Sequence, residues 1–227
     1  MMQKDYLLRI AAELASVLTA ILGFRQTKQY QAALDLIDQV FKQTLGFGSD
    51  LINSVPDETL LAMLTSFNTL DIEKCLLVAT LLNAEGDIYL DQSDLDTSYY
   101  RYLKSLHLFL EVLLNYSNTN DPDILSHIEE LLSKLEDYEL PVELQINLFR
   151  YYERTGRYSQ AEDTLFEVIE ADHNDNQAAT DILEQGIAFY QRLLKKKDAD
   201  LVAGNFSREK TQVGLTLLQT MNQTLDN

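Results

Sequence analysis

One turn pattern recurs three times in this chain, and it limits the fold more than any other feature of the sequence. In each copy an aromatic residue is followed by Tyr or Leu six positions later, a small residue three positions after that, and a bulky residue four further on. The copies are Phe24, Tyr30, Ala33 and Ile37; Tyr89, Leu95, Ser98 and Tyr102; and Tyr152, Tyr158, Ala161 and Leu165. A small residue at that place lets two antiparallel helices approach closely. We therefore expect three helical hairpins.

The rest of the chain is also expected to be helical. Apolar residues recur at spacings of three and four, and alternating β-branched runs are missing. All three prolines stand where a helix would begin, so none interrupts one. The helix-start signals are Ser54 with Pro56 and Glu58, Asp71, Asp121 with Pro122, Pro141, and Ser207. The sequence thus predicts an all-α protein.

These signals predict about ten helices, over residues 2–23, 28–46, 55–67, 71–92, 94–116, 121–138, 141–155, 158–172, 174–197 and 207–225. Successive turn copies are almost twice as far apart as the roughly 34 residues that separate neighbouring hairpins in common helical-repeat proteins. One further helix is therefore expected after each hairpin. The predicted hairpins span about 2–46, 71–116 and 141–172, the intervening helices about 55–67, 121–138 and 174–197, and a lone terminal helix about 207–225. We expect a single domain, residues 1–227, folded as a right-handed α-α superhelix, a solenoid stabilised by stacking of neighbouring helices.

The turn pattern resembles the tetratricopeptide repeat (TPR). The third copy is the best match, because Gly156 supplies the left-handed residue that such a turn prefers, whereas Lys28 and Ser93 replace it in the others. Four stretches, residues 1–6, 86–89, 137–141 and 151–158, together resemble a family of uncharacterised TPR-like bacterial proteins found mainly in Gram-positive species. The resemblance covers nearly the whole chain. It implies a cytosolic helical-repeat protein of unknown function, with no catalytic residues to carry over.

Charge and hydropathy exclude several classes of partner. The chain has 36 acidic and 18 basic residues and a net charge of -18, which would repel a phosphate backbone or an anionic membrane. The apolar stretch Leu14–Phe24 is too short to cross a bilayer, and no cleavage site of a signal peptide is recognisable. The single cysteine, Cys75, lies in an apolar helical stretch, which predicts a buried, inert thiol in a reducing compartment. We expect an acidic cytoplasmic protein that binds neither nucleic acid nor membrane.

No motif predicts catalysis, a cofactor or a metal. The sequence has no Gly-x-Ser-x-Gly and no Gly-rich phosphate loop. Glu170 and His173 match half of a di-iron pattern, but His107 and His127 lack the matching carboxylate. Residues 172–176 resemble the start of a calcium loop but are not followed by the required glycine and glutamate. We therefore expect no catalytic, cofactor or metal residues.

Alignment with the TPR pattern predicts a concave face on the first helix of each hairpin. Its residues are Leu18, Leu22 and Arg25; Asn83, Asp87, Leu90 and Asp91; and Glu143, Ile146, Arg150 and Glu153. The candidate partner-binding groove consists of Arg25, Asn83, Asp87, Asp91, Arg150 and Arg154. Its two aspartates are expected to meet a basic segment, and Arg150 and Arg154 an acidic group. The Lys and Asn set with which TPR clamps hold a C-terminal carboxylate is absent, which argues against a receptor for chaperone tails.

Two functions remain open on this evidence. The leading hypothesis is a non-catalytic scaffold that binds a protein or peptide partner. The alternative is a TPR-type regulatory sensor that binds a short peptide and relays a change in curvature. A hydrolase or metal-binding helical protein is a remote alternative, since it requires carboxylates that converge on an isolated histidine. A homodimer through the end helices also stays open, because terminal repeats lack a neighbour.

Overall fold

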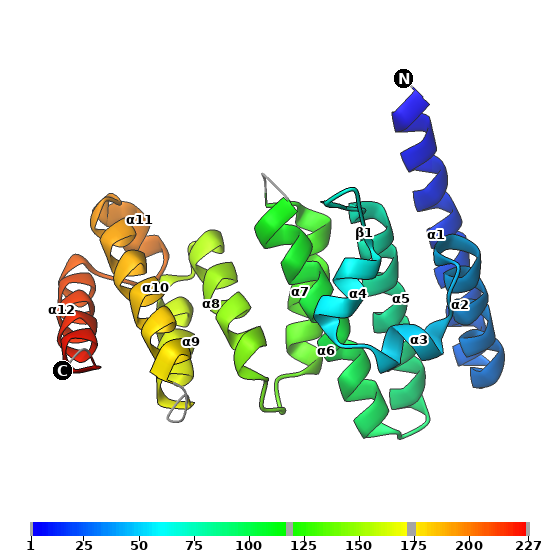
Figure 1. Cartoon of the computed structure of the whole chain (residues 1–227). Helices are drawn as coiled ribbons and strands as arrows, with labels where there is room; N and C mark the ends of the chain where they lie inside the picture. The colour runs from blue at the N-terminus through cyan, green and yellow to red at the C-terminus, as the bar shows by residue number, and fades with distance from the viewer. Residues whose placement is uncertain (1, 117–119, 172–175, 226–227) are drawn as a thin grey trace. The chain divides into compact units, whose positions relative to one another are not determined.

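The computed structural model describes residues 2–116, 120–171 and 176–225, and the side chains of residues 14–116, 120–170 and 181–223 (Figure 1). α-Helices make up 81% of the described residues. The described residues form twelve α-helices, one π-helical segment and one two-stranded hairpin. The all-α class is therefore confirmed. The chain divides into two compact units, residues 1–138 and 139–227. A superhelix over the whole chain, and a single domain of residues 1–227, stay predictions.

The first unit, over its described residues 2–116 and 120–138, contains seven α-helices and the strand hairpin. The bounds are α1 (Met2–Gln26), α2 (Tyr30–Leu45), α3 (Ser49–Ser54), α4 (Asp57–Met63), β1 (Thr65–Ser66), β2 (Thr69–Leu70), α5 (Ile72–Asp91), α6 (Leu95–Glu111), the π-helical η1 (Val112–Tyr116) and α7 (Pro122–Lys134). α1 packs against α2, and α5 packs against α6 (Figure 1), so the first two predicted hairpins are present. α7 takes the place of the intervening helix predicted over 121–138 and lies against α6.

The second unit, over its described residues 139–171 and 176–225, contains five α-helices. They are α8 (Val142–Thr155), α9 (Tyr158–Ala171), α10 (Asn176–Leu194), α11 (Asp198–Ala203) and α12 (Arg208–Leu225). α8 packs against α9, which is the third predicted hairpin. The terminal helix predicted over 207–225 is present as α12, but it is not isolated. It packs along α10 and buries Leu218 in one apolar cluster with Phe189 and Leu165.

The three repeated turns have the same backbone. Lys28, Ser93 and Gly156 all adopt the left-handed conformation, with φ of 56°, 63° and 79°. In each turn the following N–H donates to the carbonyl of the repeated aromatic residue: Gln29 to Phe24 at 2.8 Å, Asp94 to Tyr89 at 2.9 Å, and Arg157 to Tyr152 at 2.8 Å. This bond is the outer hydrogen bond of a Schellman motif. The sequence repeat is therefore a repeated structural turn, even where glycine is replaced.

Small residues lie where the paired helices meet. Ala33 and Ala161 are completely buried, and Ser98 is 2% exposed. On α5, Gly86 faces the ring of Tyr102 so closely that a Cβ at this glycine would lie 2.4 Å from a ring carbon. Ser105 of α6 also donates a hydrogen bond of 2.7 Å to a carbonyl oxygen of α5. The small-residue positions of the repeat are confirmed as helix contacts.

The prediction of a helix over residues 55–67 is wrong at the C-terminal end. α4 stops at Met63, and the chain then forms the β1–β2 hairpin, in which Thr65 pairs with Leu70. Phe67 and Asn68 form its turn, with φ of 50° and 59°. Three threonine or serine residues in six positions favour this extended pairing over another helical turn, because their side chains compete for backbone hydrogen bonds. The expectation of a chain without strands is corrected accordingly.

The short helices α3 and α11 were not predicted. Each has only six residues, which is less than two turns and too short for a periodic apolar pattern. Ser54, interpreted as a helix start, instead ends α3, and its hydroxyl donates to the carbonyl of Leu51 at 3.1 Å. The other side-chain caps are confirmed: Asp71 accepts from the Lys74 N–H, Asp121 from the Asp123 N–H, and Ser207 from the Lys210 N–H.

The structure also locates the apolar stretch Leu14–Phe24 and the single cysteine, Cys75. The apolar stretch Leu14–Phe24 belongs to α1, where Ile21 is buried and Leu22 is half exposed. Within the described part of the chain, every helix is too short or too polar to cross a membrane. Cys75 is buried in α5, and burial raises the pKa of its thiol to about 12, which confirms the expected buried thiol.

The left-handed turn residues provide a test of this fold. Replacing Ser93 by glycine removes the steric cost of a Cβ at positive φ, and we expect the free energy of unfolding to rise by about 0.5–1 kcal/mol. Gln92, the neighbouring residue at φ of −86°, is the matched control, because Gln92→Gly gains no such relief and loses stability. Urea unfolding followed by circular dichroism measures both. Equal effects of the two substitutions would contradict the assigned turn.

Candidate functional site

Side chains from four helices of the first unit converge on Asp87. The resulting cluster, called the Asp87 network, comprises Arg25 of α1, Asn83, Asp87 and Asp91 of α5, Tyr102 of α6, and Glu130 and Lys134 of α7. The three α5 residues share one face because they are spaced by four, and Arg25 reaches them from the last turn of α1. The local sequence pattern therefore places all three polar groups of α5 in one row.

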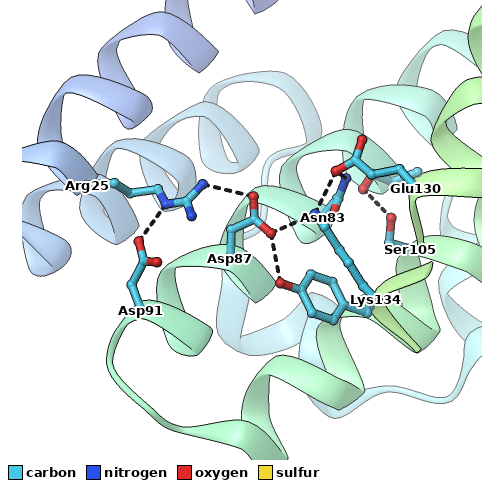
Figure 2. Close-up of polar contacts among 9 residues, drawn as sticks. Arg25, Asn83, Asp87, Asp91, Ser105, Glu130 and Lys134 are labelled. Carbon is cyan, nitrogen blue, oxygen red and sulfur yellow. Dashed lines mark hydrogen bonds and ion pairs between the residues drawn. The ribbon is translucent and has the colours of Figure 1, made fainter. Parts of the chain in front are cut away.

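Asp87 lies between two cations (Figure 2). Its Oδ2 accepts a hydrogen bond of 2.8 Å from Nη1 of Arg25, and its Oδ1 accepts from Nζ of Lys134 at 2.7 Å and from the Tyr102 hydroxyl at 2.8 Å. Nε of Arg25 also donates to Asp91 at 2.8 Å. The carboxylate of Asp87 is thus paired on both sides, and its side chain is only 23% exposed.

Lys134 completes the network on α7. Its Nζ donates to Oδ1 of Asn83 at 2.8 Å, forms an ion pair of 2.6 Å with Glu130, and lies 4.9 Å from the centre of the Tyr102 ring. Asn83 is 7% exposed, and its amide nitrogen donates to Glu130 at 3.3 Å. Every polar group of this buried amide is therefore used to tie α5 to α7.

The pKa values in the network show which effect prevails at each group. Burial opposes the charge of Arg25, but the carboxylates of Asp91 and Asp87 outweigh it and raise the pKa of the guanidinium. Burial also acts against the charge of Glu130, yet the ion pair with Lys134 lowers the pKa of this carboxyl. For Tyr102, burial and the hydrogen bond to Asp87 both raise the pKa of the phenol. These shifts favour the charged forms of Arg25 and Glu130 and the neutral phenol of Tyr102.

Four of the six candidate groove residues lie in this network. They are Arg25, Asn83, Asp87 and Asp91, which contact one another or share the contact with Lys134. The basic groups that Asp87 and Asp91 meet belong to the same chain, since Arg25 contacts both and Lys134 contacts Asp87. These four residues are thus positioned to hold helices together.

Apolar side chains of the predicted concave face remain exposed beside the network. Leu22 of α1 is 50% exposed, and Leu90 of α5 is 45% exposed. Leu22 precedes Arg25 by three residues and Leu90 follows Asp87 by three, so each leucine shares a helix face with a network residue. The face of α1 and α5 formed by Leu22, Arg25, Asp87, Leu90 and Asp91, called the α1–α5 face, combines exposed leucines with fixed charges.

A second polar cluster surrounds Glu85, whose side chain is 2% exposed. Its carboxylate accepts hydrogen bonds from the Ser49 hydroxyl at 2.6 Å, from the Asn53 amide at 3.1 Å and from Nε of Arg101 at 3.0 Å. The Arg101 guanidinium also lies 5.4 Å from the centre of the Tyr89 ring. These residues line a pocket of about 320 Å³, called the Glu85 pocket, between α2, α3, α5 and α6.

Burial dominates the electrostatics of Glu85. Loss of contact with water raises the pKa of its carboxyl, and this effect exceeds the lowering by Ser49, Arg101 and Asn53. At the edge of the pocket, Asp38 shows the opposite direction. Its pKa is lowered, first by the hydrogen bond from Lys42 and then by the Ser49 N–H. Of these two carboxyls, Glu85 therefore binds a proton more readily than Asp38.

The remaining candidate residues, Arg150 and Arg154, lie on α8 in the second unit. Arg150 donates two hydrogen bonds, of 3.1 and 2.8 Å, to the side-chain oxygen of Gln185 on α10. Arg154 lies in the last turn of α8 and is partly buried. Beside them, Glu153 of the predicted face forms a two-bond ion pair with Arg192 of α10, at 2.6 and 2.7 Å. Arg150 and Glu153 of α8 thus contact α10.

The histidines are arranged as follows. Nδ1 of His107 lies 3.7 Å from Asp57, whose carboxylate also pairs with Lys104 at 3.2 Å. Lys104 in turn donates to two carbonyl groups at the end of α3, which gives this cluster a helix-capping role. His127 stacks on Phe109.

Among the side chains that the structure describes, no three His, Cys, Asp or Glu residues are grouped to hold a metal ion. His173 and the calcium-like stretch 172–176 are not within the described part, apart from the backbone of Asn176.

Comparison with known proteins identifies the family. A family model described as "Family of unknown function (DUF6483)" matches residues 1–223. The chain belongs to this family. Neither a curated protein nor a solved structure matches it significantly. Membership in DUF6483 agrees with the expected family of unknown function, and it assigns no residue a role.

Several residues that shape these sites were not singled out from the sequence of this DUF6483 member. Lys134 completes the Asp87 network, but the distance in sequence between α5 and α7 hides its contact. Tyr102 is marked by the turn pattern only as a bulky residue, and its hydrogen bond to Asp87 was not predicted. Glu85 carried a usable signal, because it is one of two carboxylates, with Asp87, in the mainly apolar stretch 75–90. An acidic residue on the buried side of a helix needs a donor, and here Arg101 supplies one.

The Asp87 network predicts a specific loss of stability. Asp87→Asn removes the charge that compensates Arg25 and Lys134, and we expect the free energy of unfolding to fall by roughly 1–3 kcal/mol. Urea unfolding at neutral pH measures the change. Asp96→Asn is the matched control, since Asp96 is an exposed aspartate outside the network, in the first turn of α6, and its loss is expected to cost no more than about 0.5 kcal/mol. Similar losses in the two variants would refute the importance of the network.

Glu85 predicts a pH dependence with a definite sign. Its pKa is raised above the ordinary 4.5, so between the two values the folded state holds a proton that the unfolded state has lost. The contribution of Glu85 to the free energy of unfolding therefore falls as the pH rises through this interval. Carbon-detected NMR titration of Glu85 gives the pKa, and urea unfolding against pH in wild type and Glu85→Gln isolates the contribution. A titration below pH 4.5 would overturn the assigned direction.

Proposed function

We propose that this protein is a non-catalytic, TPR-like interaction module of the bacterial cytoplasm, which binds a protein or peptide partner on the α1–α5 face. The observation that carries the proposal is the exposure of Leu22 and Leu90, 50% and 45%, beside the charges of the Asp87 network. Exposed apolar side chains next to fixed charges are typical of protein-binding surfaces, because the apolar groups supply affinity and the charges supply orientation.

The rigidity of this face supports the proposal further. Arg25 joins α1 to α5 through two charged hydrogen bonds of 2.8 Å, and Lys134 joins α5 to α7. A surface whose charged groups are already ordered loses little conformational freedom on binding, so more of the interaction energy remains for affinity. The same order argues for the scaffold over a curvature-changing peptide sensor, which requires a second arrangement of these helices.

The regulatory sensor, the homodimer and the remote enzymatic alternative stay hypotheses. For an enzyme, the strongest feature is the approach of Asp57 to His107 at 3.7 Å, since a carboxylate near an imidazole is a component of acid–base sites. Lys104 competes for the same carboxylate, and the buried Nε2 of His107 has no hydrogen-bond partner within the described part of the chain. The binding module remains the better-supported function.

Capture of a partner from the lysate of a native host tests the α1–α5 face. We expect Leu22→Asp combined with Leu90→Asp to lower the recovered partner at least tenfold, on the order of the loss of one hot-spot contact. Val213→Asp combined with Leu217→Asp is the matched control, since these two side chains of α12 are 64% and 47% exposed. Circular dichroism verifies that both variants keep their helicity. Equal recovery with the two variants, or no partner at all, would count against the proposal.

A further inference from the structure

The tip of the β1–β2 hairpin exposes the side chain of Phe67 completely. Its relative exposure of 101% is the largest among the large apolar residues of the described chain. Phe67 and Asn68 form the turn with φ of 50° and 59°, and positive φ at both centre residues is the pattern of a type I′ turn. This conformation favours Asn and Gly and disfavours a bulky side chain. Phe67 is thus unfavourable to the folded chain in two respects, its exposure and its backbone conformation.

The rest of the hairpin holds this tip in place. Thr65 pairs with Leu70, and both Leu64 and Leu70 are buried. At the base of the hairpin the Asp71 N–H donates to the carbonyl of Leu64 at 2.9 Å, and the Thr65 hydroxyl donates to the carbonyl of Leu61 in α4 at 2.8 Å. Phe67 therefore projects from an anchored turn, and a partner that covers its ring needs to order little of the chain.

Two further exposed side chains lie at the same end of the α5–α6 pair. Met63 ends α4 directly before the hairpin and is 37% exposed, and Tyr116 ends η1 and is 43% exposed. η1 continues α6 and contacts α5, so it returns to the end of the pair where the hairpin enters α5 (Figure 1). Met63, Phe67 and Tyr116, called the Phe67 end, give this end of the unit an apolar character.

The Phe67 end is also uncharged. Residues 59–70 and 112–116 contain no charged side chain, although charged residues make up 24% of the chain. The nearest charged residues on either side of the first stretch, Glu58 and Asp71, are acidic, and the whole chain carries a net charge of -18. An anionic bilayer therefore repels this end. A single projecting ring without charged neighbours instead suits an uncharged apolar pocket of a protein, in which burial removes its unfavourable exposure.

From these observations we propose that the Phe67 end docks into an uncharged apolar pocket of a protein partner, with the Phe67 ring as the anchor. Aromatic anchors in desolvated pockets dominate the affinity of many protein interfaces. The inference goes beyond the proposed function. Phe67 precedes the 20-residue α5 and Leu90 lies near its other end, so the two surfaces are separated by roughly 30 Å along the helix.

Thermal unfolding distinguishes a binding role of Phe67 from a structural one. Phe67→Asn places at positive φ a residue that tolerates it, and we expect the Tm to rise by about 1–4 °C. Tyr100→Asn is the matched control, because this ring is 63% exposed within α6, where asparagine gains no such relief. Differential scanning calorimetry measures both variants. A Tm lowered by Phe67→Asn would show that the ring stabilises the fold, and it would overturn the proposal.

Photo-crosslinking of the full chain tests the docking itself. The photoreactive residue p-benzoyl-phenylalanine replaces Phe67 in one variant and Tyr100 in the matched control, and both are irradiated in a membrane-free lysate of the native host. We expect a crosslinked protein only from position 67. An excess of unmodified wild type is expected to lower its yield at least tenfold, and an equal excess of Phe67→Asn less than twofold. No product, the same product from both positions, or equal competition by the two chains would contradict the docking.

Other occupants of the Phe67 end give different results. A product of twice the mass of the chain identifies a second copy. Flotation of wild type, but not of Phe67→Asn, with vesicles of phosphatidylcholine and phosphatidylglycerol identifies a membrane. Either result replaces the protein pocket and refutes the proposal.

The Phe67 end and the α1–α5 face fail independently. The chain with Leu22→Asp and Leu90→Asp is expected to compete for the crosslinked product as well as wild type does. A Phe67-dependent product without a partner that depends on Leu22 and Leu90 removes only the α1–α5 face. The reverse result removes only the Phe67 end.

Discussion

The ion pairs of Asp87 are the constraint on which the first unit depends. A carboxylate that is only 23% exposed requires compensation, and Arg25 and Lys134 supply it from helices on either side of α5. Because the two cations come from α1 and α7, the single charge of Asp87 sets the position of both helices against α5. The Tyr102 hydroxyl adds α6 to the same group. The Asp87 carboxylate of α5 thus contacts side chains from three other helices, α1, α6 and α7, and these contacts add to the apolar packing between the helices.

Because of these ion pairs, the charged residues of the predicted concave face interact with one another within the chain. Arg25 and Asp87 were expected to bind a partner, but their charges are paired within the chain, so the proposed function rests on the adjacent exposed leucines. In the Glu85 pocket the buried Glu85 is paired directly with Arg101, while the exposed Asp35 and Asp50 act on Lys42 at longer range. In both places, pairing in the folded state decides which groups remain available to a partner.

Much of the fold was predictable, because its determinants are local. Helix periodicity, side-chain caps such as Asp71, and the prolines at helix starts all act within a few residues. The errors have local causes as well: α3 and α11 are shorter than two helical turns, and the β1–β2 hairpin uses a turn of Phe67 and Asn68 without the usual glycine. For the candidate site, register predicted that Arg25 and Asp87 lie on one face, but it did not predict their direct contact.

The sequence by itself therefore determined the helical class, the three hairpin turns and the small residues at their contacts. These features follow from the backbone preferences and side-chain sizes of residues close together in the chain, as the left-handed Gly156 illustrates. Only the tertiary structure decided which charges are neutralised, because Arg25 and Lys134 reach Asp87 across large separations in sequence. The same is true of Glu85, whose burial and pairing with Arg101 depend on how α5 and α6 pack. Coulomb interactions and desolvation depend on distance and burial in space, and residue order specifies neither.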